Sequence, residues 1–130
     1  MLFFGHRFLK NQKFYHVFDI DSIITTPPAS TMYIEFDENN LDIINYLQEN
    51  KMNFALKVKT VTEIAYASSL GATYIVVESH LAKTAQRIAE NYLFDSKILV
   101  SIQNEDEIEE LVLLNVDGVI FPNAIVKVTP

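Results

Sequence analysis

Hydrophobic positions in the second half of the chain alternate between two spacings. Short apolar runs, rich in β-branched residues, occupy 54–58, 74–77, 98–102 and 119–121, and such runs predict strands buried on both faces. Apolar residues at three- and four-residue steps predict helices at 40–50, 61–70, 81–93 and 105–114. This alternation is typical of parallel β/α units. We expect a single three-layer α/β/α domain over residues 1–130, with a mainly parallel, Rossmann-like sheet and helices on both faces.

The N-terminal third has a different pattern. Residues 14–20 and 31–36 predict two further strands. A parallel connection between them needs a dozen or more residues and usually a helix, which Pro27-Pro28 disfavours. We therefore expect a β-flap over residues 22–36, after the first core strand. Residues 1–13 predict an arm, or a short extra strand paired with residues 14–18.

Composition excludes several classes of protein. A chain of 130 residues is too short for a full barrel of eight β/α units, which takes about 250. The net charge of −7 disfavours nucleic acid and anionic lipid as partners. No apolar run approaches the roughly 18 residues of a membrane span, so we expect a cytoplasmic protein. The absence of cysteine and the presence of only three glycines exclude cysteine metal sites and glycine-rich nucleotide loops.

Two carboxylates follow the first predicted core strand, in the segment Val17-Phe18-Asp19-Ile20-Asp21. Residues two apart in a strand point to the same side. Such a pair can hold a hard cation through its oxygens, or combine a nucleophile with an acid/base group. Acidic residues that simply end a strand at the solvent are the alternative.

This segment resembles the first motif of the haloacid dehalogenase (HAD) superfamily of phosphohydrolases. Residues 14–125 resemble its small cap-less members, of the 3-deoxy-D-manno-octulosonate 8-phosphate phosphatase type, in the order of their elements. The resemblance implies that Asp19 is a nucleophile that becomes phosphorylated and that Asp21 is the acid/base. Both would bind Mg²⁺. It further implies that Lys83 steadies the phosphoryl charge, and that flaps join subunits into a homo-oligomer, a tetramer in that family.

Other family motifs are altered in this chain. At the end of the second strand only Thr60 offers a hydroxyl to the phosphoryl group, and Asn104 and Glu105 stand where acidic residues would complete the metal site. Asn104 also fits a helix cap with Glu107. The function implied is a Mg²⁺-dependent phosphohydrolase of a small phosphorylated metabolite, such as a sugar phosphate. A catalytically inactive HAD-like scaffold for binding or assembly is the alternative.

Three further charged residues lie near the carboxyl ends of predicted strands. They are Glu35, Lys57 and Glu78, and open α/β sheets bind ligands at that edge. A lysine flanked by two acids suggests a Schiff-base or phosphate site. A charge network at the sheet edge is the alternative. His80 follows the third strand of the regular part and is expected to be exposed near a helix start.

Overall fold

The chain folds around one parallel sheet of eight strands. The computed structural model describes residues 1–129. Its strands follow the order β1-β7-β6-β5-β4-β3-β2-β8 across the sheet, and every neighbouring pair is parallel. The strands are β1 (Leu2–Phe4), β2 (Phe14–His16), β3 (Thr31–Glu35), β4 (Phe54–Lys57), β5 (Tyr74–Glu78), β6 (Lys97–Ser101), β7 (Gly118–Ile120) and β8 (Ile125–Lys127). The expected α/β class with a parallel, Rossmann-like sheet is confirmed.

Five α-helices and four short 3₁₀ helices connect the strands. They are α1 (Ile20–Ile23), η1 (Glu38–Asn40), α2 (Leu41–Glu49), α3 (Val61–Ser69), η2 (Ser79–Leu81), α4 (Ala82–Asn91), η3 (Glu105–Glu107), α5 (Ile108–Leu113) and η4 (Pro122–Ala124). Side-chain caps mark the beginning of α1 and α3. For α3, Thr60 Oγ1 accepts a hydrogen bond from the Glu63 backbone N–H at 3.1 Å, and Glu63 accepts one from the Lys59 N–H. These reciprocal bonds follow the capping-box pattern.

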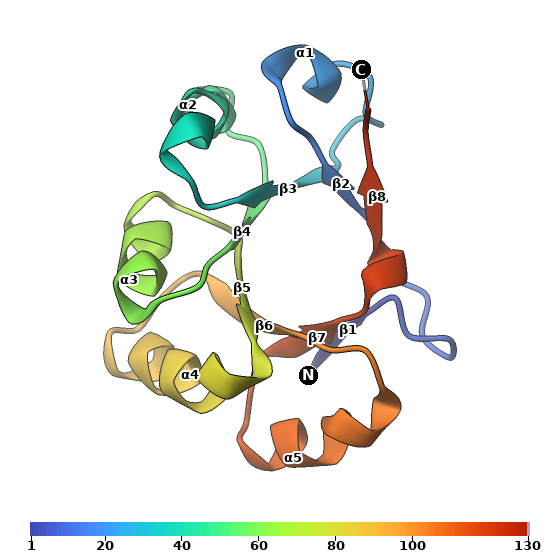
Figure 1. The fold of residues 1–130 in the computed structure, drawn as a ribbon, viewed down its shortest axis with the longest axis vertical. Coiled ribbons are helices and arrows are strands. Elements are labelled where there is room, and N and C mark those ends of the chain that lie inside the picture. Colours follow the sequence, from blue (N-terminus) through green and yellow to red (C-terminus); the bar gives the residue numbers. More distant parts are fainter. Residues whose placement is uncertain (130) are drawn as a thin grey trace.

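The sheet curls, and the α-helices lie along its outer side (Figure 1). This distribution differs from the two covered faces expected from the sequence. From β2 to β7, each strand in the sequence lies next to the preceding one, always on the same side of it. Because the crossovers between parallel strands are right-handed, they place successive helices on the same face of the sheet. The outer apolar cluster accordingly contains helix residues such as Ile44, Ile64 and Leu111.

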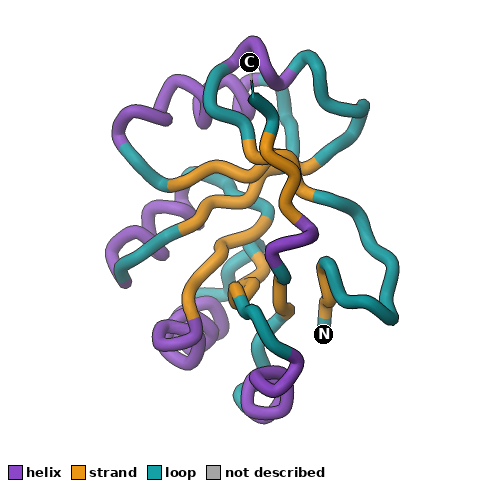
Figure 2. The backbone as a smooth tube through the Cα atoms, turned by 45° about the vertical axis from the view of Figure 1, so that its right-hand side comes forward, coloured by secondary structure: helices purple, strands orange, loops and turns teal. Residues whose placement is uncertain are grey.

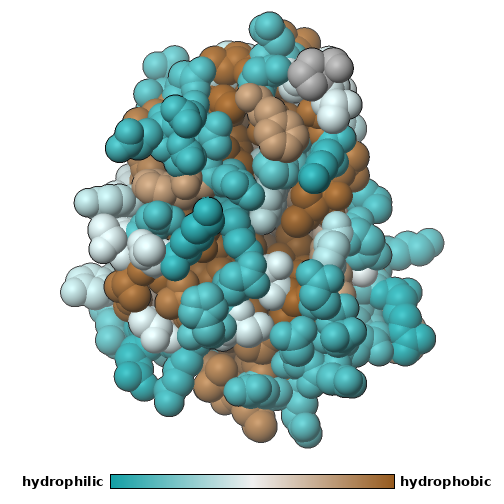
Figure 3. Space-filling view, in the orientation of Figure 1, coloured by the Kyte–Doolittle hydropathy of each residue, from teal (hydrophilic) through white to brown (hydrophobic). Residues whose placement is uncertain are grey.

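The inner face of the curled sheet is filled by its own side chains. This second cluster contains no residue of an α-helix; its members are Phe4, Phe14, Tyr33, Ala55, Val76, Leu99, Ile120 and Ala124. In the orientation of Figure 1, hydrophobic side chains reach the surface in the middle of the view, between hydrophilic ones (Figure 3). The inside of the curl is therefore a packed core.

The β-flap expected over residues 22–36 is replaced by a parallel β/α unit. Residues 31–35 form β3, which pairs in parallel with β2 and β4 in the middle of the sheet. The connection fits because α1 is a single turn that ends before Pro27-Pro28. Thr25 and Thr26 close that turn by donating from their hydroxyls to the carbonyls of Ser22 and Ile23, each at 2.7 Å.

The expected extra strand at the N-terminus exists, but its partner is different. β1 pairs with β7 and not with residues 14–18. The chain then returns to β2 through a long loop without a helix, residues 5–13 (Figure 2). Within the described residues, β1 and β8 remain the two edges of the sheet. The fold thus approaches a barrel in its curvature without eight complete β/α units.

None of the helices in residues 1–129 has the length and hydrophobicity needed to cross a membrane.

Candidate functional site

Polar side chains replace apolar ones on the inner face where the strands end. Side chains two residues apart on a strand point the same way. Because Phe14, Tyr33, Ala55, Val76, Leu99 and Ile125 belong to or pack on the inner cluster, the inward side chains two positions later are His16, Glu35, Lys57, Glu78, Ser101 and Lys127. We call these six the mouth residues. In parallel sheets and β/α barrels, ligand sites lie at this carboxyl-terminal edge.

Lys57 lies between two carboxylates of the mouth. Its Nζ is 2.5 Å from Oε1 of Glu78, and only 13% of its side chain is exposed, against 54% for Glu78. On the other side, Glu35 of β3 is the register partner of Lys57. The outer part of the lysine is thus held in a polar setting, above the apolar layer that includes Ala55 and Val76.

Tyr33 and His16 lie beside this group. Burial raises the pKa of Tyr33, and the charges of Glu35 and Glu78 raise it further, so its hydroxyl remains a hydrogen-bond donor at neutral pH. The His16 ring meets the Tyr33 ring edge-on, with centroids 5.0 Å apart. Burial also lowers the pKa of His16, against the opposing effect of Glu35. Both groups are therefore uncharged at neutral pH.

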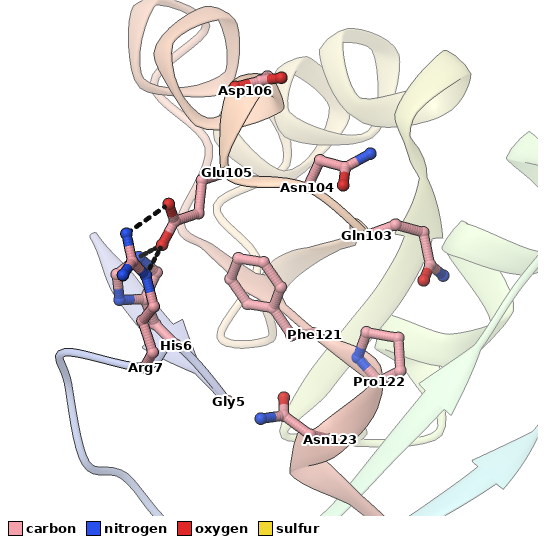
Figure 4. A pocket seen from close by; sticks show the side chains of 10 residues that line it. All are labelled: Gly5, His6, Arg7, Gln103, Asn104, Glu105, Asp106, Phe121, Pro122 and Asn123. Carbon is pink, nitrogen blue, oxygen red and sulfur yellow. Dashed lines mark hydrogen bonds and ion pairs between the residues drawn. The ribbon is translucent and has the colours of Figure 1, made fainter.

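Two cavities open at this end of the sheet. The smaller, of about 290 Å³, is lined by His16, Tyr33, Glu35, Pro122, Ile125 and Lys127. The larger, of about 580 Å³, is lined by Gly5, His6, Arg7, Gln103, Asn104, Glu105, Asp106, Phe121, Pro122 and Asn123 (Figure 4). Pro122 belongs to both walls, so the cavities adjoin. A third cavity of similar size, about 590 Å³, lies at the amino ends of β5 and β6. Volume alone does not select the site; the inward charged groups do.

An ion-pair cluster crosses one side of the larger cavity. Arg7 donates to both carboxylate oxygens of Glu105, at 2.8 and 3.2 Å, and His6 Nε2 lies 3.0 Å from the same carboxylate (Figure 4). The hydrogen bond from Arg7 lowers the pKa of Glu105 and raises that of Arg7. The contact ties the loop of residues 5–13 to the start of η3.

The two aspartates of the first motif adjoin a short helix. Asp19 is the N-cap of α1: its Oδ1 accepts a hydrogen bond from the Ser22 N–H at 2.7 Å. Hydrogen bonding from the side chain and the backbone of Ser22 lowers the pKa of Asp19. Asp21 lies in the first turn of α1 and is exposed. The carboxylate of Asp19 therefore has a structural role, whatever else it does.

The other predicted site residues are dispersed. Thr60 caps α3, and Lys83 is an exposed residue of α4. Asn104 and Glu105 line the larger cavity. Among residues 1–129, no three His, Cys, Asp or Glu side chains are grouped closely enough to hold a metal ion. The predicted ligands Asp19, Asp21 and Glu105 therefore do not form such a group, and Mg²⁺ binding stays a prediction.

The sequence indicated only part of the mouth. Glu35, Lys57 and Glu78 were identified because each lies near the end of a strand. His16, Tyr33, Lys127 and the loop residues His6 and Arg7 were missed, because neither the position of β8 beside β2 nor that of β1 beside β7 can be deduced from local patterns. His80 is exposed in η2, as expected.

The chain matches no protein-family model, and a search of the curated proteins gives no match either.

Proposed function

We propose that this protein binds and activates a small carbonyl compound as a Schiff base on Lys57. The observation that carries the proposal is the position of this lysine: it points inward at the carboxyl end of a central strand, is largely buried, and contacts Glu78 while it neighbours Glu35. A nucleophilic side chain is activated by an adjacent general base, among other means, and Glu78 is the base in contact with Lys57.

Glu78 is placed to move the proton in this reaction. The Lys57 ammonium gives one proton to Glu78, and the neutral amine attacks the carbonyl carbon. The N–C bond forms as the carbonyl π-electrons move to oxygen, which takes a second proton from nitrogen. The carbinolamine hydroxyl then receives the proton held by Glu78 and leaves as water, so that an iminium on Lys57 remains. The Tyr33 hydroxyl, kept protonated by burial and by the charges of Glu35 and Glu78, is a further hydrogen-bond donor of this region.

A phosphate site at Lys57 is less well supported. Glu35 and Glu78 place two negative charges next to one ammonium group, and an incoming phosphate would meet that negative charge. A neutral carbonyl carbon carries no such penalty. The arrangement therefore favours the lysine as a nucleophile over the lysine as an anion receptor.

Reductive trapping tests the proposal. The protein is incubated with small uncharged aldehydes and ketones, reduced with borohydride, and mapped by peptide mass spectrometry. We expect the adduct on Lys57 to form at least about tenfold faster than on exposed Lys59 or Lys83, because a positioned amine with an adjacent base gains that order of rate. Equal labelling of all three lysines would show that Lys57 has no special reactivity.

Two variants keep that test interpretable. Lys57→Met removes the nucleophile, and Lys59→Met, an exposed position two residues along the same connection, is the matched control. Circular dichroism of both variants establishes that they fold. Trapping lost in Lys57→Met and kept in Lys59→Met is the expected result.

A Mg²⁺-dependent HAD-type phosphohydrolase is the second candidate. It is supported by Asp19 and Asp21, which follow β2 directly and so lie near the same edge of the sheet. Fluorine NMR with Mg²⁺ and beryllofluoride, a mimic of the phosphoryl group on aspartate, tests it. A bound signal that disappears without Mg²⁺ and in Asp19→Asn would support the phosphatase. If no signal appears, the inactive scaffold of the same resemblance would be favoured over the phosphatase.

A further inference from the structure

We propose that the larger cavity is a subsite for hydroxyl groups, so that the substrate is a polyhydroxylated carbonyl compound such as an open-chain sugar. This inference rests on the proposed Schiff base at Lys57, since it concerns the other end of the same substrate. It names a ligand class for a cavity that contains none of the residues of the proposed imine chemistry.

The wall of the larger cavity offers amides and an aromatic ring. Gln103, Asn104 and Asn123 line it, together with the Phe121 ring (Figure 4). Within residues 1–129, the side-chain amides of Gln103 and Asn123 bond no other protein group; only backbone groups of these residues do, as when Lys13 donates to the Asn123 carbonyl. A free amide presents one acceptor and two donors, which matches hydroxyl groups that both donate and accept.

Charge argues against an anionic ligand in this cavity. Its cationic residue Arg7 is already bonded to Glu105 through two contacts. Asp106 adds a further negative charge to the wall, and the whole chain carries −7. A phosphate or carboxylate would therefore face unneutralised repulsion, whereas a neutral polyol would not.

The glycine at position 5 preserves this wall. Its φ is +83°, and a Cβ built there would lie 2.4 Å from Oδ1 of Asn123. A side chain would thus displace the amide that we assign to hydroxyl binding. The loop containing Gly5 and the η4 turn containing Asn123 are held together by Phe121 N–H donating to the Phe4 carbonyl at 2.9 Å.

Size and position fit a ligand that bridges the two cavities. About 580 Å³ lies within the roughly 300–1,000 Å³ usual for small-molecule sites. Pro122 joins it to the smaller cavity, whose wall includes Glu35, the register partner of Lys57. Lys57 itself lines neither cavity, so the proposed ligand extends from Lys57 past Glu35 and through the smaller cavity to the amides.

Alditols test the subsite apart from the lysine, because they carry hydroxyls but no carbonyl. Glycerol, erythritol, ribitol and glucitol are titrated into ¹⁵N-labelled protein and followed by NMR. We expect shifts at Gln103 and Asn123, with affinity rising from glycerol to the longer alditols. Asn123→Ala and Gln103→Ala should each weaken binding about tenfold, the usual effect of losing a hydrogen-bonding partner. Asn45→Ala, at an exposed position of α2, should change nothing.

The outcomes separate the two proposals. Alditol binding that persists in Lys57→Met and weakens in Asn123→Ala supports the subsite, whether or not Lys57 is trapped by borohydride. Trapping of Lys57 without any alditol binding would overturn the subsite and leave the Schiff base standing. Binding of inorganic phosphate at Gln103 and Asn123 in place of the alditols would also overturn it, since the charge argument would then be wrong.

Discussion

Lys57 Nζ contacts Oε1 of Glu78 at 2.5 Å, although the residue of β5 that pairs with Lys57 in register is Val76. The lysine side chain therefore extends along the inner face toward the mouth, past the level of its own backbone. The ion pair therefore lies directly above the apolar layer that contains Ala55 and Val76. It marks where the inner face changes from apolar to charged.

Removing Glu78 from its ion pair with Lys57 should show how much the pair contributes to the free energy of unfolding. Glu78→Gln leaves a largely buried ammonium without its closest carboxylate. For a fully buried pair the loss is about 3–5 kcal/mol, but because Glu78 is half exposed we expect about 1 kcal/mol. Urea unfolding measures it. In the double variant with Lys57→Met the cost should be less than the sum of the two single costs; a strictly additive result would mean that the two groups do not interact.

Two glycines with different surroundings should respond differently to alanine. A Cβ at Gly118 would lie 2.7 Å from the Leu2 carbonyl and 2.8 Å from Leu99 Cδ2, while one at Gly71 meets nothing within 4 Å. We expect Gly118→Ala to cost about 2–3 kcal/mol by overpacking and to loosen β1. Gly71→Ala, where φ is +83°, should cost about 1 kcal/mol. Thermal unfolding with hydrogen exchange at β1 distinguishes them, and equal costs would contradict the tight β1–β7 contact.

His16 should make stability depend on pH. Burial lowers its pKa below the usual 6.5, so the unfolded chain binds this proton more readily than the folded one. The contribution of His16 to the free energy of unfolding is complete above the pKa of the unfolded chain, about 6.5. It decreases as the pH falls below that value, and it stops decreasing below the pKa of the folded protein. Glu35 and Lys127 face the same ring and act in opposite directions. His16→Gln should flatten the decrease between pH 7 and 5. His80→Gln, at an exposed site, is the control; an unchanged curve in His16→Gln would refute the assignment.

Replacement of Asp19 and replacement of Asp21 should change the stability of the protein by different amounts. Asp19→Ala removes the N-cap bond to Ser22 and should lower the free energy of unfolding by more than Asp21→Ala does. Asp21→Ala, at an exposed site in the first turn of α1, should cost less than about 0.5 kcal/mol. Chemical denaturation of both variants, without and with Mg²⁺, checks this. If millimolar Mg²⁺ stabilises the native protein and neither variant, the metal site expected from the HAD resemblance gains direct support.

The regular part of the fold could be predicted because local and global signals agree there. From residue 54 to residue 121, strand runs, helical spacing and the cap of Thr60 with Glu63 agree on every strand and α-helix, with boundaries that differ from those of the structure by no more than three residues. The N-terminal third was harder because α1 is a single turn with Asp19 as its cap, too short to produce a helical period. The curl was not predictable, because one-sided and two-sided crossovers use the same β/α pattern and differ only in strand order.

The candidate site was predicted where strand ends carry charge and missed where distant segments supply the wall. Lys57 and its two acidic neighbours belong to consecutive strands, so their proximity follows from a parallel sheet. The cavity at Arg7 and Glu105 joins residues 98 positions apart. Nothing in either segment alone indicates the other.

The pairing of β1 with β7 also constrains how the molecule is made. Leu2 to Phe4 are synthesised before the rest of the sheet, yet their ladder partners are residues 118–120. Strands β2 to β7 can be added one beside another as the chain lengthens, but β1 must wait until residues 118–120 have left the ribosome. The pairing of β1 with β7 is therefore a long-range closure of high contact order, as is the pairing of β2 with β8. Until β1 has paired, neither Phe4 in the inner core nor the Arg7 side of the larger cavity is in place.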